Sequence, residues 1–403
     1  MATWNPVIIN NVEGCYLENL GDLGTIDPEG CNNGPFRDLS PLVSINLNYI
    51  PCKVTTQSGS KPTYTYYDNR MDSYFLCSTD NYAKNSNLTQ VYNINNDVVN
   101  MSSTFSGCKK LNYLSNLPSN LENMEGAFYQ CTSLTTLPDI PASVKKAGNA
   151  FGGCTGLVNP PTFLGTNIDG NRIFKGCTNL TSTPDLSKFS RLDYAFYECI
   201  NLTTINGNFN PNITSLAQTF YFCTNLTGVV PPIPAGVTNI MQSFTGSKIT
   251  SYSFSQNNSP VYMGYAFINC KDLVTADVNN ATDLDQTFSG CTSLISCTGT
   301  INPGCTNMYG TFTGCTSLTT IPEIPVAITN MEYTFSGCTA LHGNIIIRSS
   351  EVSNITNIFA GTQATKYVYI PYNSTTYNTF IAAGYDENGT KEGVYLRDIS
   401  TLS

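Results

Sequence analysis

The stretch that decides the fold is TFTGCTSLTTIPEIP at residues 311–325. Its opening phrase recurs as TFSGCTSL at 287–294 and as TFSGCTAL at 334–341. In each copy a Cys follows the Phe by three residues, and a Leu follows the Cys by three more. Self-similarity at a fixed period of this size predicts a solenoid. Twelve phenylalanines head such copies at steps of 21 to 24 residues: Phe105, Phe128, Phe151, Phe174, Phe196, Phe220, Phe244, Phe267, Phe288, Phe312, Phe335 and Phe359.

Residues 308–331 illustrate what one turn of the repeat is expected to do. Met308, Phe312 and Cys315 stand at i, i+4 and i+7, and this spacing predicts one face of a short helical or 3₁₀ segment. Leu318 and Ile321 follow within a run rich in Thr, which favours a short strand with both apolar side chains pointing inward.

One short helix and one strand in each turn define an α/β repeat of the leucine-rich type. We therefore predict a leucine-rich-repeat solenoid of about twelve turns, with a parallel sheet on one face. The expected organisation is an N-terminal capping and anchoring domain outside the repeat over residues 1–97, the solenoid over 98–365, and a C-terminal cap over 366–403.

The repeated cysteine is interpreted first as a packing residue, because free Cys is among the most buried residue types. It is present in ten copies, whereas Ser247 and Thr362 replace it in the other two. Disulfides between adjacent turns and a metal site are the two alternatives. Cys297 and Cys305, outside the ladder, stand at apolar positions of their turns and are also expected in the core.

Composition excludes several functions. The net charge is −9 and only 12% of residues are charged, which argues against a nucleic-acid partner. No apolar run is long enough for membrane insertion. The first residues lack the features of a secretory signal peptide, so synthesis and folding in a cytoplasm are expected. His342 is the single histidine of the sequence, and no nucleophile or second base stands at a spacing typical of a catalytic motif. We therefore expect no catalytic residues. No cofactor and no metal site are expected either.

The phrase F-x-x-C-x-x-L, followed by x-x-I-P and then by TNIM or TNM, resembles the BspA-like leucine-rich repeats over about residues 98–365. The stretch YVYIPYNSTTYNTFIAAGY at 367–385 resembles the cap that often closes such arrays. The resemblance implies a curved solenoid without catalytic residues or cofactor. Members of the family are mostly bacterial surface and adhesion proteins, with others in protists and phages. The seventh copy departs from the pattern, and residues 1–97 do not match it.

The outward positions of the strands are the candidate binding surface, because a hydroxyl-rich face with occasional aromatic rings suits a glycan or a protein strip. The irregular seventh copy adds three residues to it. The alternative is that Thr simply suits exposed strands. The candidate residues are Tyr113, Thr136, Thr204, Tyr252, Phe254, Gln256 and Thr320.

Three functions remain open. The first is a non-enzymatic phage virion component, such as an appendage, fibre or decoration protein, that adheres to a host surface protein or glycan. Residues 1–97 would then hold it to other virion proteins or to copies of itself as a homo-oligomer. The second is a bacterial cell-surface adhesin. The third is a glycan-processing enzyme, which would need two carboxylates about 5–10 Å apart in a cleft.

Overall fold

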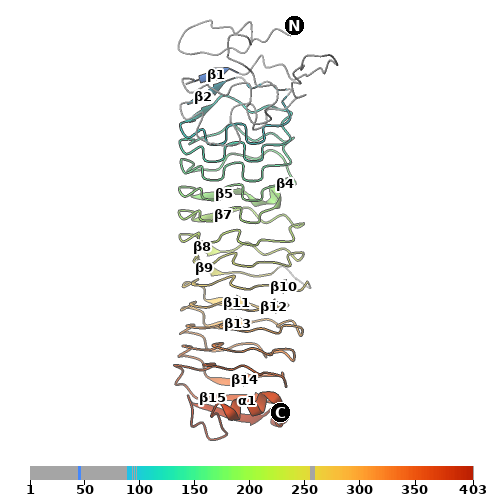
Figure 1. Cartoon of the computed structure of the whole chain (residues 1–403), viewed down its shortest axis with the longest axis vertical. Coiled ribbons are helices and arrows are strands. Elements are labelled where there is room, and N and C mark those ends of the chain that lie inside the picture. Colours follow the sequence, from blue (N-terminus) through green and yellow to red (C-terminus); the bar gives the residue numbers. More distant parts are fainter. Residues whose placement is uncertain are drawn as a thin grey trace, which may run out of the picture. The chain divides into compact units, whose positions relative to one another are not determined.

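The computed structural model describes residues 44–46, 89–92, 94, 96, 98–254 and 259–402. Nearly all of the predicted domain at residues 1–97 therefore lies outside the described residues. The chain divides into two compact units, Met1–Leu202 and Thr203–Ser403. Within each unit the backbone winds into turns that stack directly on one another (Figure 1).

The strands of the first unit are short and pair in parallel. In one sheet the order is β1-β2-β3, and Gln90 and Val91 lie opposite Tyr113 and Leu114. β4 pairs with β6 in the same sense. The strands are β1 (Ser44–Asn46), β2 (Gln90–Tyr92), β3 (Tyr113–Leu114), β4 (Ile168–Asp169), β5 (Ser182–Asp185) and β6 (Phe189–Arg191).

The second unit repeats this design. β8 pairs with β9, β10 with β12 and β11 with β13, and β14, β15 and β16 form a three-stranded sheet, all in parallel. The predicted parallel-sheet solenoid of the leucine-rich type is thus confirmed. The elements are β7 (Thr204–Asn206), β8 (Thr227–Val229), β9 (Lys248–Ser251), β10 (Val261–Tyr262), β11 (Thr275–Asp277), β12 (Ala281–Asp283), β13 (Ser296–Thr298), β14 (Gly343–Ile346), β15 (Lys366–Ile370), α1 (Thr375–Ala382) and β16 (Val394–Asp398).

The core of each unit is a ladder of stacked phenyl rings. The ring centroids of Phe151 and Phe174 lie 5.3 Å apart in the first unit, and those of Phe288 and Phe312 lie 5.6 Å apart in the second. These separations fall in the range of favourable offset stacking. Because the Met, Cys and Leu positions of the repeat are buried beside the rings, each turn completes its apolar core only against its neighbours.

The segment from Met308 to Cys315 is not the helix that its spacing predicted. It is a chain of tight turns in which Thr311 N–H donates to the Met308 carbonyl and Cys315 N–H to the Phe312 carbonyl. The alternate amides, such as that of Phe312, donate to the next turn of the solenoid instead. Gly310 and Gly314 adopt φ of 55° and 72°, and this left-handed backbone is incompatible with a right-handed helix.

The last turn is closed by residues that follow the repeat. Tyr385 packs edge-on against Phe359 with ring centroids 6.0 Å apart. α1 begins after Ser374, whose hydroxyl accepts a hydrogen bond from Tyr377 N–H, and it buries Phe380 beside Tyr385. Within the described ranges, no helix has the length and apolar character needed to cross a bilayer.

Candidate functional site

In each unit the outward candidate positions face solvent. These positions are called the strand surface: Tyr113 and Thr136 in the first unit, and Thr204 and Thr320 in the second. The Tyr113 side chain is 45% exposed, and its ring lies 5.4 Å from that of Tyr92. The three threonines are exposed as well. Within the described part of the chain, the hydroxyls of Thr136 and Thr320 form no hydrogen bond, so they remain available to a ligand.

The neighbouring threonine position contributes less to this surface. The Thr319 hydroxyl donates to the Ile295 carbonyl at 3.0 Å, and the Thr181 hydroxyl donates to the Val158 carbonyl at 3.0 Å. Both hydroxyl groups therefore donate a hydrogen bond to a carbonyl of the preceding turn. In the Thr319–Thr320 pair, one hydroxyl thus joins neighbouring turns and the other is left to solvent.

Tyr252 does not belong to this surface, which corrects the sequence-based assignment. Its side chain is buried, and its ring stacks on that of Phe267 at a centroid separation of 4.2 Å. Its hydroxyl exchanges hydrogen bonds with the backbone of Asp277, and burial raises the pKa of this phenol well above its usual value. The strand register aligns Tyr252 with the buried Val230 of the preceding turn, so the tyrosine occupies an inward position. Phe254 is half-buried beside it, while Gln256 lies outside the described residues.

The cysteine ladder has a role that sequence reasoning missed. The Cys154 thiol donates to the Phe128 carbonyl at 3.0 Å, and the Cys291 thiol donates to the Phe267 carbonyl at 3.0 Å. Burial raises the pKa of Cys154 to about 12, so the thiol keeps its proton at neutral pH. A protonated, buried thiol is neither a nucleophile nor a metal ligand. No disulfide joins any of the twelve cysteines among the described residues, and Cys297 and Cys305 are buried as predicted.

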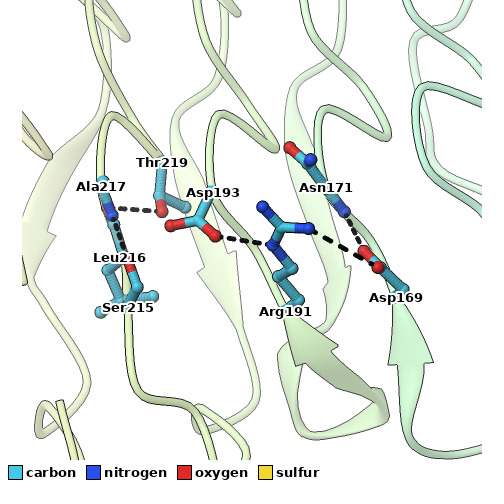
Figure 2. Close-up of polar contacts among 8 residues, drawn as sticks. All are labelled: Asp169, Asn171, Arg191, Asp193, Ser215, Leu216, Ala217 and Thr219. Atoms are coloured by element: carbon cyan, nitrogen blue, oxygen red, sulfur yellow. Dashed lines mark hydrogen bonds and ion pairs between the residues drawn. The ribbon is translucent and has the colours of Figure 1, made fainter.

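A second feature that the sequence analysis overlooked runs along the edge of the turns. The residue before each Met position is usually Asn or Asp, and its side chain accepts a hydrogen bond from the amide two residues later. Asp169 accepts from Asn171 N–H at 3.0 Å, and Ser215 accepts from Ala217 N–H at 3.3 Å (Figure 2). Such Asx turns fix the chain where it enters the tight turns. The repeated TN before Met or Ile was the available signal.

In the first unit, Arg191 occupies the position that is usually Asn or Asp in the other copies. Its guanidinium donates to Asp193 at 2.9 Å and lies 3.8 Å from the Asp169 carboxylate, so one cation serves two anions (Figure 2). The pairs are partly exposed and are worth about 0–1 kcal/mol each. The side-chain oxygen of nearby Asn171 is buried without a hydrogen-bond partner, and nothing in the structure explains it.

No cluster of catalytic chemistry forms in the described part of the chain. His342 is exposed and its Nδ1 lies 2.8 Å from the Ala340 carbonyl oxygen. Among the residues that the structure describes, no three His, Cys, Asp or Glu side chains are placed to hold a metal ion. The other exposed groups of the candidate site are the threonines and Tyr113 of the strand surface and the charged side chains of Arg191 and Asp169 at the edge of the turns.

The parallel strands, the stacked phenyl ladder and the exposed threonines define a leucine-rich-repeat solenoid. The family model for the BspA type leucine-rich repeat region matches residues 78–193 and 166–274, in six copies. Residues 78–274 of the chain therefore carry BspA-type leucine-rich repeats. Residues 256–369 also match a family described as Mycoplasma protein of unknown function. No curated protein matches the chain.

One solved structure supports the fold. The chain is similar to a leucine-rich repeat protein from Bacteroides ovatus, with 21% identity and a TM-score of 0.52 over 90% of this chain and 93% of that chain. It is also similar to a leucine rich cell surface protein from Faecalibacterium prausnitzii, with 22% identity and a TM-score of 0.33 over 75% of this chain and 90% of that chain. At 21% identity the first likeness establishes the fold alone.

Proposed function

We infer that the chain is a non-enzymatic adhesin displayed on a bacterial cell surface, where the strand surface binds a host protein or glycan. The observation that carries this is the array itself: rigid BspA-type turns repeat an outward threonine whose hydroxyl is left to solvent, as at Thr136 and Thr320. A rigid scaffold that repeats one small polar group suits an extended ligand better than a small one.

The BspA-type family favours the adhesin over the virion component, because its members are mostly bacterial surface proteins. The virion role and attachment through residues 1–97 rest on the sequence pattern alone. The glycan-processing enzyme is less well supported, since it needs two carboxylates free to act on a sugar. Asp169 and Asp193 are instead both engaged by Arg191.

The location is tested by antibody labelling of intact and lysed cells of the bacterium that carries the gene. Labelling of intact cells, with loss of the label after external protease, is the expected result. Labelling only after lysis, or labelling confined to purified phage particles, would refute the cell-surface role.

The binding surface is tested by a triple variant, Thr136→Glu, Thr204→Glu and Thr320→Glu. Each change places a charge on the strand surface without touching the core. Beads coated with this variant should adhere to an epithelial monolayer at least about tenfold less than wild-type beads, because about 1.4 kcal/mol of lost binding free energy already gives tenfold.

The matched control introduces the same three charges at other exposed threonines, Thr166, Thr238 and Thr306. These stand at other positions of the turns than the strand surface, so adhesion should stay at the wild-type level. Equal loss in the control and the test variant would mean that charge alone, and not the strand surface, governs adhesion.

A further inference from the structure

Two cations and two tyrosines of adjacent turns meet in the first unit. The guanidinium of Arg172 lies 4.8 Å from the ring centroid of Tyr194, and the ammonium of Lys175 lies 4.7 Å from that of Tyr197. The two ring centroids are 6.2 Å apart. These four residues form the cation–tyrosine cluster.

The repeat explains how the cluster is assembled. Arg172 and Lys175 flank the buried Phe174 at the same positions at which Tyr194 and Tyr197 flank Phe196. The Phe side chains point into the core, while the flanking positions lie at the surface: Arg172 is exposed and the other three are half-buried. Arg172 N–H donates to the Asp193 carbonyl at 2.9 Å, and Gly176 N–H donates to the Tyr197 carbonyl at 2.7 Å, so the two turns are held in register.

Both cations of the cluster are electrostatically unmatched. Over the described residues, neither Arg172 nor Lys175 forms an ion pair or a side-chain hydrogen bond. Arg191 is close in sequence but has its charge satisfied by two aspartates. The contacts with the tyrosine rings are worth about 0.5–1 kcal/mol each at an exposed site, and they orient the cations without using their N–H donors.

The surrounding sequence has the sign opposite to that of the whole chain. Residues 140–198, which include all four members of the cluster, hold six cations and four anions. The segment thus carries a net charge of +2 (6 − 4) within a chain of −9. Two unpaired cations in a segment with excess positive charge favour an anionic ligand by charge complementarity.

We propose that the cation–tyrosine cluster binds the carboxylate groups of an acidic polysaccharide. A guanidinium matches a carboxylate with two parallel N–H donors, and a lysine adds a point charge to a second one. The tyrosine rings supply amphipathic flat surfaces to the sugar rings beside the carboxylates. Nucleic acid fits less well, because it presents a charge about every 1.7 Å and needs many more cations than this segment has.

The test uses the whole chain and polygalacturonate, whose carboxylates are ionised at pH 7. Binding is measured by biolayer interferometry for the wild type and for Arg172→Gln/Lys175→Gln. The double variant should bind at least about tenfold more weakly, and raising the salt concentration should weaken the wild type toward it. Fully methyl-esterified polygalacturonate, which has no charge, should not compete.

A charge-matched variant, Lys109→Gln/Lys271→Gln, removes two exposed cations elsewhere and should bind like the wild type. Thermal melting of both variants checks that the fold is kept. Arg172→Lys should retain part of the affinity, since it keeps the charge and loses the bidentate geometry.

The proposal is overturned if the wild type does not bind polygalacturonate, or if the double variant binds it as tightly as the wild type. Tighter binding to poly(dT) or to phosphatidylglycerol vesicles than to polygalacturonate would identify a different class of anion and also overturn it. Because the cluster lies outside the strand surface, epithelial adhesion that survives in the double variant leaves the proposed function standing.

Discussion

Replacing Cys291 by Ser should destabilise the protein at least as much as replacing it by Ala. The Cys291 thiol donates to the Phe267 carbonyl of the preceding turn at 3.0 Å. The C–O bond of serine is shorter than the C–S bond of cysteine, so a serine hydroxyl reaches less far toward this carbonyl. The chain has a serine at the equivalent position of another copy. Ser247 occupies the same repeat position, and its hydroxyl lies 3.4 Å from the Cys270 sulfur and forms no bond to a Phe carbonyl.

The cost of Cys291→Ala follows from three contributions. Removing one buried sulfur, taken as equal to a methylene, costs about 0.8 kcal/mol. A void of roughly 25 Å³ adds about 0.6 kcal/mol. The lost thiol hydrogen bond adds about 0.5 kcal/mol, at the low end because Cys270 N–H also donates to the Phe267 carbonyl. The total is about 2 kcal/mol. Cys291→Ser should cost about 2–3 kcal/mol, because a hydroxyl at this position does not bond to the Phe carbonyl of the preceding turn: that of Ser247 lies against Cys270, and that of Thr362 donates to Phe359 of its own turn.

Urea denaturation followed by far-ultraviolet circular dichroism gives the change in midpoint for each variant. Hydrogen exchange of the amides around Phe288 locates the loss, because repeat arrays can open locally. If the free energy of unfolding of Cys291→Ser is within about 0.5 kcal/mol of the wild-type value, a serine hydroxyl replaces the thiol adequately. The argument that only the longer C–S bond reaches the carbonyl of the preceding turn would then be wrong.

Three further predictions test the core and the last turn. Phe288→Ala removes a ring stacked on both sides and should cost about 3–5 kcal/mol by the same denaturation assay; a cost near 1 kcal/mol would mean that the ladder collapses around the gap. The ladder thiols should stay unreactive toward a thiol reagent until urea is added, because burial raises the pKa of Cys270 to about 12. Burial lowers the pKa of Lys366 from 10.5 to about 8. The unfolded state then binds the Lys366 proton more tightly, so the free energy of unfolding relative to Lys366→Met should rise between pH 8 and 10; a difference that stays flat contradicts this.

The repeat pattern predicted the parallel solenoid because the spacing of Phe, Cys and Leu is kept in nearly every copy. It misread the segment before Cys, since spacing of i, i+4 and i+7 fits a helix and also fits alternating tight turns. The distinguishing feature is left-handed backbone two residues before and two residues after each Phe. In the turn of Phe267 these are Tyr265 and Asn269, with φ of 61° and 58°; asparagine favours that conformation, but tyrosine does not signal it.

The binding role of the candidate residues stays a prediction, and only their exposure can be compared with the structure. Thr136, Thr204 and Thr320 are exposed, as expected for polar residues beside the buried Leu positions of their turns. Tyr252 was misplaced, because the irregular spacing of the seventh copy hides that this tyrosine aligns with the buried Val230 of the preceding turn. The cation–tyrosine cluster could not be found from spacing, because its partners are 22 residues apart and meet only when turns stack.

The alternating hydrogen bonds of the tight turns bear on how such a gene can change. In the tight turns, one amide donates to a carbonyl of its own turn and the next amide donates to the neighbouring turn. A single codon inserted within the tight turns would exchange these two kinds of hydrogen bond for the residues that follow it in that segment. The array avoids this: its period is 21 residues from Phe267 to Phe288 and 24 from Phe288 to Phe312, and the difference falls between the Leu of one copy and the Leu or Met that opens the next. Recombination between whole copies preserves the alternation. We therefore expect natural alleles to differ by entire repeats or in the return segments, which makes the length of the protein easier to alter than the design of any turn.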